Sequence, residues 1–137
     1  MDSAAKSIQT VTAAIIERSG KFLIAKRKAG SHLEGLWEFP GGTVEKDEEP
    51  EACIIRELKE ELGIESIVIG FFGQSTFNYE TKVVRLLAFR IRYISGVFVA
   101  YEHEELRWVP ACELAEYSFA PADLPFVENL VSAERSG

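Results

Sequence analysis

The sequence predicts one α/β domain in which a mixed β-sheet is sandwiched between helices. Three features support this prediction. Strand-like apolar runs occupy both halves of the chain, an amphipathic helical segment separates them, and further helical segments close the chain. At 137 residues, with 47% hydrophobic and 27% charged residues, the composition is that of an ordinary globular protein with a single core. We expect one domain over residues 1–137.

The first strands are expected ahead of Pro40. Apolar runs at 11–16 and 22–25 are separated by a segment that contains Ser19-Gly20, a turn signal that favours a β-hairpin. The chain then becomes loop-like before a short strand at 37–39.

The segment from Pro50 to Leu62 predicts an amphipathic helix. Proline suits a first helical turn, and Gly63 suits a C-terminal cap. At about 100° per residue, Ile55, Leu58 and Leu62 form one stripe, which we expect to be buried.

Strands return after this helix. Residues 66–80 and 82–94 are rich in β-branched and aromatic types and predict an antiparallel pair. A further strand is expected at 106–109, followed by a short helix at 110–117 and a longer one at 124–133. The chain contains no internal repeat and no linker.

Three carboxylates share the other side of the predicted helix. Glu57, Glu60 and Glu61 stand at i, i+3 and i+4, the spacings that bring side chains together. Like charges so spaced destabilise a helix by a few tenths of a kcal/mol, so the cluster is either well solvated or binds a cation. A solvated surface is the commoner explanation, and the residues around the helix favour the cation.

The segment from Gly42 to Ile64 resembles the Nudix box, G-x5-E-x7-R-E-U-x-E-E-x-G-U. Its fixed positions are filled by Gly42, Glu48, Arg56, Glu57, Leu58, Glu60, Glu61, Gly63 and Ile64. The resemblance is to MutT-like members of this family, and it implies a Nudix-type α/β/α sandwich. In that fold the box helix covers one face of the mixed sheet and the terminal helices cover the other. It also implies a hydrolase in which water attacks a nucleotide phosphate, by family practice at the β-phosphorus.

The resemblance implies that Mg2+, or Mn2+ as a substitute, binds the acidic helix face. Carboxylate and carbonyl oxygens are the hard ligands that these ions prefer. The expected metal ligands are Gly41 through its carbonyl, Glu57, Glu60, Glu61 and Glu102. The expected catalytic residues are Glu57, Glu60, Arg56 and Glu102, with Glu48 in a supporting role. Glu60 and Glu102 are each expected to act either as a ligand or as the base that orients water, although a loop glutamate such as Glu102 is often merely exposed.

The expected substrate-binding residues are Arg27, Phe39, Gly42, Tyr79 and Asp123. Arg27 lies where MutT-like enzymes carry an arginine that contacts base or phosphate, and a solvated strand end is its alternative explanation. Tyr79 and Phe77 offer rings on which a base can stack. Cross-strand packing explains the two rings equally well.

Asp123 bears on which base is bound. MutT-like enzymes that act on oxidised guanine nucleotides carry Asn at the matching place, whereas an ionised Asp only accepts hydrogen bonds. An acceptor suits the exocyclic amino group of cytosine. The stretch from Ala120 to Pro125 also resembles the ending of the CTP pyrophosphohydrolase branch. A purely structural alternative is that Asp123 caps the last helix.

The expected activity is therefore Mg2+-dependent hydrolysis of a nucleoside triphosphate to monophosphate and pyrophosphate. CTP, dCTP or a 5-methyl or 5-hydroxy dCTP is the expected substrate. One alternative is an 8-oxo-dGTP hydrolase that cleans the nucleotide pool. Another is a nucleotide-sensing module without catalysis, against which the complete set of box acids weighs.

Composition excludes other classes of protein. A net charge of −7 argues against a polymeric nucleic acid as partner, because that affinity depends on Lys and Arg. We find no secretory apolar region and no run long enough to span a membrane. With only Cys53 and Cys112, a reduced cytoplasmic protein is expected, as a monomer or homodimer, with Cys53 a buried small hydrophobe. The spacing around His103 predicts no metal site.

Overall fold

The computed structural model describes residues 6–136. The elements follow in the order β1 (Ser7–Arg18), β2 (Lys21–Lys26), β3 (Trp37–Glu38), α1 (Pro50–Leu62), β4 (Glu65–Asn78), β5 (Lys82–Ser95), β6 (Glu105–Pro110), α2 (Ala111–Leu114), a 3-10 turn η1 (Pro121–Asp123) and α3 (Leu124–Ser136).

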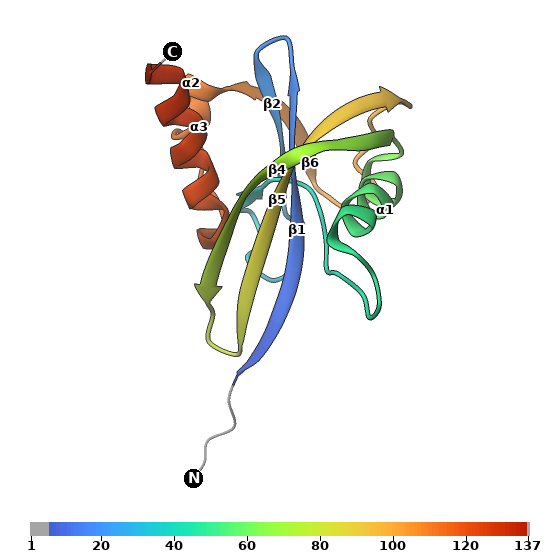
Figure 1. Cartoon of the computed structure of the whole chain (residues 1–137). Helices are drawn as coiled ribbons and strands as arrows, with labels where there is room; N and C mark the ends of the chain where they lie inside the picture. The colour runs from blue at the N-terminus through green and yellow to red at the C-terminus, as the bar shows by residue number, and fades with distance from the viewer. Residues whose placement is uncertain (1–5, 137) are drawn as a thin grey trace.

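The strands form one mixed sheet of order β3-β2-β1-β5-β4, with β6 paired to β2. Strand β1 is parallel to β5 along residues 7–16, and the remaining strand pairs are antiparallel. The end of β1, at Glu17 and Arg18, turns through Ser19-Gly20 and pairs with the start of β2. The predicted hairpin and the predicted β4–β5 pair are both confirmed. Strand β1 therefore joins the two halves of the sheet (Figure 1).

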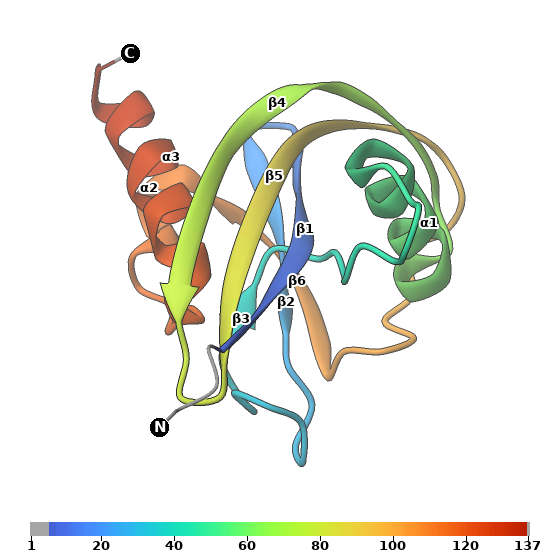
Figure 2. The same cartoon turned by 60° about the horizontal axis from the view of Figure 1, so that its bottom comes forward.

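Helices cover both faces of the sheet, so the predicted three-layer sandwich is confirmed (Figure 2). Successive residues of a strand point to opposite faces. Ile15 accordingly packs in a cluster with Phe126 of α3, whereas Ile16 packs in a second cluster with Leu58 and Leu62 of α1. Each fully buried side chain of this kind stabilises the fold by about 1.5–3 kcal/mol.

Helix α1 begins at Pro50 and ends before Gly63, whose φ of 74° is the left-handed conformation expected of a C-terminal cap. Its buried stripe differs from the prediction. Ile54 is fully buried and Ile55 only partly so, and Glu61 is also buried. The helix is therefore rotated so that one of the three acids faces the interior of the molecule.

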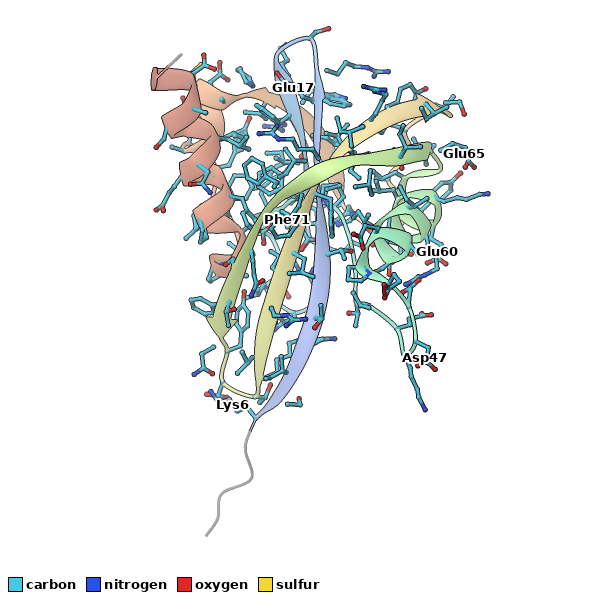
Figure 3. The ribbon with its side chains drawn as sticks, viewed as in Figure 1. Lys6, Glu17, Asp47, Glu60, Glu65 and Phe71 are labelled. Carbon is cyan, nitrogen blue, oxygen red and sulfur yellow. The ribbon has the colours of Figure 1, made fainter. Side chains whose placement is uncertain are left out.

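The loop that leads into α1 projects from the body of the protein, with Asp47 near its tip, and Glu60 lies further along on α1 itself (Figure 3).

Helix α2 is shorter than the predicted segment 110–117 because the chain beyond it pairs with β3. The N–H of Trp37 donates to the Ser118 carbonyl at 2.8 Å, and the Ala120 N–H donates to the Trp37 carbonyl at 2.9 Å. Helix α3 begins where predicted and is longer. No helix within residues 6–136 has both the length and the apolar character needed to cross a bilayer.

Candidate active site

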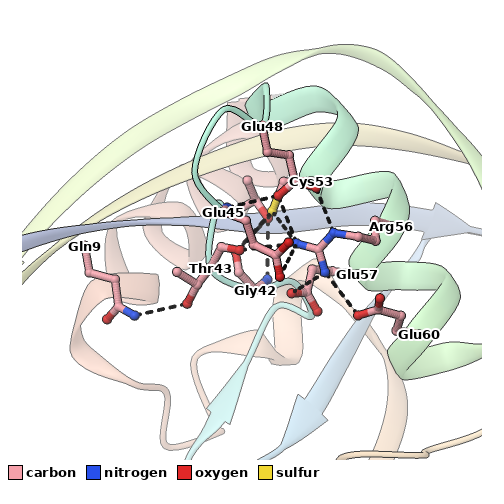
Figure 4. Close-up of polar contacts among 10 residues, drawn as sticks. Gln9, Gly42, Thr43, Glu45, Glu48, Cys53, Arg56, Glu57 and Glu60 are labelled. Atoms are coloured by element: carbon pink, nitrogen blue, oxygen red, sulfur yellow. Dashed lines mark hydrogen bonds and ion pairs between the residues drawn. The ribbon is translucent and has the colours of Figure 1, made fainter.

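Arg56 is the centre of the ionic network on α1. Its guanidinium donates to Glu48 twice, from Nε to Oε2 at 2.7 Å and from Nη2 to Oε1 at 2.9 Å (Figure 4). Paired, charge-assisted bonds of this kind are among the strongest that side chains make. They lower the pKa of Glu48 to about 2 and raise the pKa of Arg56. Glu48 thus anchors Arg56 to the loop that precedes the helix.

The same guanidinium also holds two box carboxylates. Arg56 Nη1 donates to Glu57 Oε2 at 3.3 Å and to Glu60 Oε1 at 3.1 Å. The side chain of Glu60 is 54% exposed, whereas that of Glu57 is 15% exposed. Arg56 therefore restricts the rotamers of both acids.

Gly41 and Gly42 run beside β1 and under α1. The Thr12 N–H donates to the Gly42 carbonyl at 2.8 Å. A Cβ added to Gly42 would lie 2.2 Å from Cδ of Glu57, and one added to Gly41 would lie 1.9 Å from the Thr12 carbonyl oxygen. The two positions therefore exclude side chains for different reasons. At Gly42 the obstacle is the Glu57 carboxylate, and at Gly41 it is the backbone of Thr12.

Glu61 is the buried member of the acidic cluster. Its side chain is 7% exposed, and its Oε1 has no hydrogen-bond partner among the residues that the structure describes. Burial raises the pKa of Glu61 to about 10, and the nearby carboxylates of Glu57, Glu38 and Glu102 add to the effect. Glu61 lines a cavity of about 230 Å³ together with Gly41, Glu102 and Arg27.

These residues fit a hard divalent cation. Between residues 6 and 136, no three His, Cys, Asp or Glu side chains already form a metal cage. Glu57 and Glu60 instead face Arg56. The unpartnered Oε1 of Glu61 and its raised pKa, however, mark a place where positive charge would be stabilising. Because the donors are all oxygen, Glu57, Glu60, Glu61, Glu102 and the Gly41 carbonyl suit Mg2+ or Mn2+.

A pocket of about 210 Å³ lies beside this cluster, and all five predicted substrate-binding residues line it, namely Arg27, Phe39, Gly42, Tyr79 and Asp123. Phe77 is not among its lining residues and packs on Tyr79, with ring centroids 4.7 Å apart. Arg27 is not simply a solvated strand end. It donates from Nε to the His32 carbonyl at 2.5 Å and from Nη1 to Glu38 Oε1 at 3.0 Å.

Asp123 lies in the floor of the pocket and is buried. Its Oδ2 accepts the Phe39 N–H at 2.9 Å, and its carboxylate makes no hydrogen bond to the first turn of α3 in the described chain. The capping explanation is therefore wrong, because the carboxylate joins η1 to the end of β3. Burial raises the pKa of Asp123 well above its ordinary value, and the charge of Glu38 acts in the same direction.

The raised pKa means that Asp123 takes up a proton more readily than an exposed aspartate, and the acceptor-only prediction applies to its ionised form alone. A protonated carboxyl accepts through one oxygen and donates through the other. While Oδ2 accepts the Phe39 N–H, a protonated Asp123 can also donate to a base. The Asp side chain can thus offer both kinds of hydrogen bond, as the Asn of other members can.

Sequence reasoning missed His103 and Glu38. His103 is buried, with Nε2 2.8 Å from Glu38 Oε2 and Nδ1 3.9 Å from Glu61 Oε1. No spacing rule connects a loop histidine with a two-residue strand and a helix 42 positions earlier. Cys53 is buried, as predicted, and burial raises the pKa of its thiol to about 11.

Comparison with known proteins agrees with this geometry. A NUDIX domain model matches residues 6–130. The CTP pyrophosphohydrolase of Escherichia coli (strain K12) is 43% identical over 122 residues, which covers 89% of this chain and 90% of that protein. The putative 8-oxo-dGTP diphosphatase 2 of Mycobacterium tuberculosis (strain CDC 1551 / Oshkosh) is 36% identical over 125 residues, 89% of this chain and 87% of that protein.

A solved structure also shares the fold. The crystal structure of the MutT protein from Methanosarcina mazei Go1 matches with a TM-score of 0.84 and 30% identity, covering 96% of this chain and 99% of that one. Because the family model and these relatives match most of the chain, the chain belongs to the NUDIX domain family and is a MutT-like Nudix hydrolase.

Proposed function

We propose that the chain is a Mg2+-dependent nucleoside triphosphate pyrophosphohydrolase that releases a nucleoside monophosphate and pyrophosphate. Its preferred substrate in this proposal is CTP, dCTP or a dCTP modified at C5. The observation that carries the proposal is that a pocket with an aromatic wall and a buried carboxyl group adjoins the acidic cluster of α1, and Arg27 and Gly41 line both the cavity at Glu61 and that pocket.

The chemistry of the residues that line the two cavities supports a nucleotide. In this proposal Tyr79 and Phe39 contact the base in the larger pocket, and Asp123 hydrogen-bonds its edge. The triphosphate then extends past Gly42 to the acids of α1. Glycine at this point allows the backbone to approach the phosphates and leaves room for the Glu57 carboxylate.

Hydrolysis breaks the bond between the α- and β-phosphates and adds water to one phosphorus. The chemistry that the divalent cation supplies when bound is neutralisation of phosphate charge and activation of the attacking water. Arg56 keeps Glu57 and Glu60 oriented, and Glu60 or Glu102 accepts the proton that the water loses. Most of the rate enhancement in such a reaction comes from positioning and charge stabilisation.

The base preference is argued from Asp123 and from the relatives. In its ionised form Asp123 accepts from the exocyclic amino group of cytosine. The E. coli relative, 43% identical, is named a CTP pyrophosphohydrolase. Two points support 8-oxo-dGTP as the second candidate. The raised pKa of Asp123 favours a protonated form, which could also donate to a base, and a 36% identical relative is named a putative 8-oxo-dGTP diphosphatase.

A panel of triphosphates tests the proposal. We expect the kcat/KM for CTP, dCTP or 5-methyl-dCTP to exceed that for UTP, dGTP and 8-oxo-dGTP, with pyrophosphate released and strict dependence on Mg2+. Pyrophosphate and orthophosphate are measured separately, because release of orthophosphate alone would indicate cleavage at the other phosphoanhydride. A preference for 8-oxo-dGTP over every pyrimidine would replace the cytidine proposal with the second candidate.

Glu57→Gln is the control for this panel. The change removes one negative charge that we assign to the cation while the side chain keeps its size. Activity that belongs to this chain should fall at least about a hundredfold, because metal-derived charge stabilisation is worth several kcal/mol. Turnover of the same size in wild type and variant would identify a contaminating phosphatase and leave the chain without hydrolytic activity, as the nucleotide-sensing alternative predicts.

A further inference from the structure

Thr12 lies on β1 beside the glycine segment, residues 41–43, and is only 1% exposed. Three hydrogen bonds join it to Gly42. The Thr12 N–H and the Thr12 hydroxyl both donate to the Gly42 carbonyl, at 2.8 and 3.1 Å, and the Gly42 N–H donates to Thr12 Oγ1 at 3.4 Å. One residue of the sheet therefore engages both polar backbone groups of Gly42.

The bond from the Gly42 N–H fixes the direction of the Gly41 carbonyl. These two groups belong to one planar peptide unit, and the described chain contains no cis peptide bond. In a trans unit the C=O and the N–H point in opposite directions. While the Gly42 N–H faces the Thr12 hydroxyl, the Gly41 oxygen therefore faces away from it. Gly41 lines the cavity that Glu61 and Glu102 also line.

Cys53 joins the same junction from α1. It is fully buried, and its sulfur lies 3.4 Å from Thr12 Oγ1 and 3.5 Å from the carbonyl oxygens of both Gly42 and Thr43 (Figure 4). Its one hydrogen can be donated to any of these three acceptors. Glu57 stands four residues later on the same face of the helix. The junction therefore ties the helix that carries the acids to the glycine segment.

We propose that Thr12 is a positioning residue that holds the Gly41–Gly42 peptide so that the Gly41 carbonyl oxygen faces the cation, with Cys53 linking this peptide to α1. The inference rests on the proposed function, in which the Gly41 carbonyl and the acids of α1 bind the cation. Because those ligands come from two separate elements, their geometry depends on the contact between the elements. Loss of such an outer partner typically weakens metal affinity or activity by about 10–100-fold.

Packing alone does not account for a threonine at position 12. Valine would fill the same space with a second methyl group, and it would leave the Gly42 N–H without its side-chain partner. Glycine also has more conformational freedom to lose than any other residue, and the hydroxyl restricts it. The tie from Arg56 Nη2 to the Thr43 carbonyl, at 3.4 Å, reaches the glycine segment one residue further on.

Two substitutions separate the hydroxyl of Thr12 from its methyl group. Thr12→Val keeps the branched shape and removes the hydroxyl, whereas Thr12→Ser keeps the hydroxyl and removes the methyl group. Thr10→Val is the matched control, because Thr10 lies two residues earlier on the same face of β1. Thr10 reaches the same loop through its backbone carbonyl, which accepts the Val44 N–H at 2.9 Å, and that bond survives the substitution.

Amide hydrogen exchange in the metal-free protein, followed by NMR, tests the geometry. The Gly42 N–H should exchange several-fold faster in Thr12→Val than in wild type or in Thr12→Ser. The Ala14 N–H, which donates to the Pro40 carbonyl at 2.8 Å, is the internal reference, and its exchange should not change. Equal acceleration at both amides would show that the hydroxyl stabilises the fold as a whole and not this peptide, and would overturn the proposal.

Mn2+ binding, measured by electron paramagnetic resonance, tests the consequence for the cation. Nucleotide is left out, because Thr12 also lines the proposed nucleotide pocket. Thr12→Val should raise the Kd for Mn2+ about tenfold, while Thr12→Ser and Thr10→Val stay within about threefold of wild type. Unfolding temperatures are measured alongside, because a purely structural role predicts that Mn2+ affinity follows stability.

Equal Mn2+ affinities in Thr12→Val and Thr12→Ser would overturn the proposal, whatever their unfolding temperatures. If wild type itself binds no Mn2+, the proposed function fails instead, so the two failures are distinguishable. Should Thr12→Val not fold, Cys53→Ala replaces it, with Cys53→Ser, which keeps a donor, as its control. Cys53→Ala should raise the Kd about fivefold, since a thiol is only a weak donor, and an unchanged Kd would overturn the proposal.

Discussion

The two ends of the candidate site are built in opposite ways. At the end where we propose that the phosphates bind, the phosphate end, Glu48 and Glu60 converge on Arg56, and all three belong to one short segment of chain. At the end where we propose that the base binds, the base end, Asp123 accepts the N–H of Phe39, a residue 84 positions earlier. The first arrangement follows from helical spacing, and the second exists only once the fold is complete. Their ionisable groups also differ, since the pKa of Glu48 is lowered and that of Asp123 is raised.

The adjacent glycines provide the strongest way to separate activity from stability at the phosphate end. Gly42→Ala puts a methyl group 2.2 Å from Glu57 Cδ, so the flexible carboxylate must move away from its position. A shift of about 1 Å in a reacting group can cost about a hundredfold, and we expect a loss in kcat of that order. The unfolding temperature should stay close to that of wild type.

Gly41→Ala is the contrasting variant. Its methyl group would lie 1.9 Å from the Thr12 carbonyl oxygen, which is backbone and cannot move aside. Overpacking of this kind costs about 1–3 kcal/mol or more, so we expect a clear loss of stability in thermal or urea unfolding. If Gly42→Ala were the less stable of the two variants, it would be wrong that the glycine at position 42 serves mainly to leave room for the Glu57 carboxylate.

The contrast also explains what the sequence can predict. The positions of α1 and of its acids follow from proline at the start, glycine at the cap and contacts at i, i+3 and i+4. The rotation of the helix could not be predicted, because the face that packs on the sheet depends on β1 and β5. For that reason Glu61 is buried where a solvated or shared acidic face was expected.

The role of Asp123 shows the same limit at the base end. The family resemblance predicted Asp123 as one of five substrate-binding residues, and all five line the same pocket. The hydrogen bond from the Phe39 N–H to Asp123 could not be predicted, because η1 and the end of β3 meet only in the folded chain. The upward shift of the Asp123 pKa was also out of reach, since it depends on burial and on Glu38. His103 was missed for the same reason.

Asp123→Asn sharpens the comparison by changing the base end alone. The amide oxygen can still accept the Phe39 N–H, and a neutral amide carries no charge to bury. We expect folding to be retained and the ratio of kcat/KM between cytidine and 8-oxoguanine nucleotides to change about tenfold, within the 1–3 kcal/mol of one base contact. The Mg2+ concentration for half-maximal rate should not change.

Two results would contradict this prediction. An unchanged ratio of kcat/KM values would show that Asp123 does not contact the base. A changed Mg2+ requirement would show that the two ends are not independent, and the coupling would then have to pass through Glu38, whose charge affects both Asp123 and Glu61.

The smallest expected effect is on acid stability at the phosphate end. The pKa of Glu48 is about 2 in the folded chain, against an ordinary value of 4.5, so the unfolded chain binds more protons between these values. Stability from the Glu48–Arg56 pair is therefore complete above pH 4.5 and is lost as pH falls toward 2. Between pH 4.5 and pH 2, the unfolding temperature of wild type should fall by a few degrees more than that of Glu48→Gln.

Glu61 and Asp123 do not obscure this measurement. Their pKa values are raised, so the stability linked to their protons has the opposite sign and is lost as pH rises. Both acids are present in wild type and in Glu48→Gln, so the difference between the two melting curves belongs to Glu48. Curves that stay parallel down to pH 2 would mean that Arg56 does not lower the pKa of Glu48 in solution. Arg56 would then be free to turn wholly toward Glu57 and Glu60, and its loop anchor would have no role in orienting them.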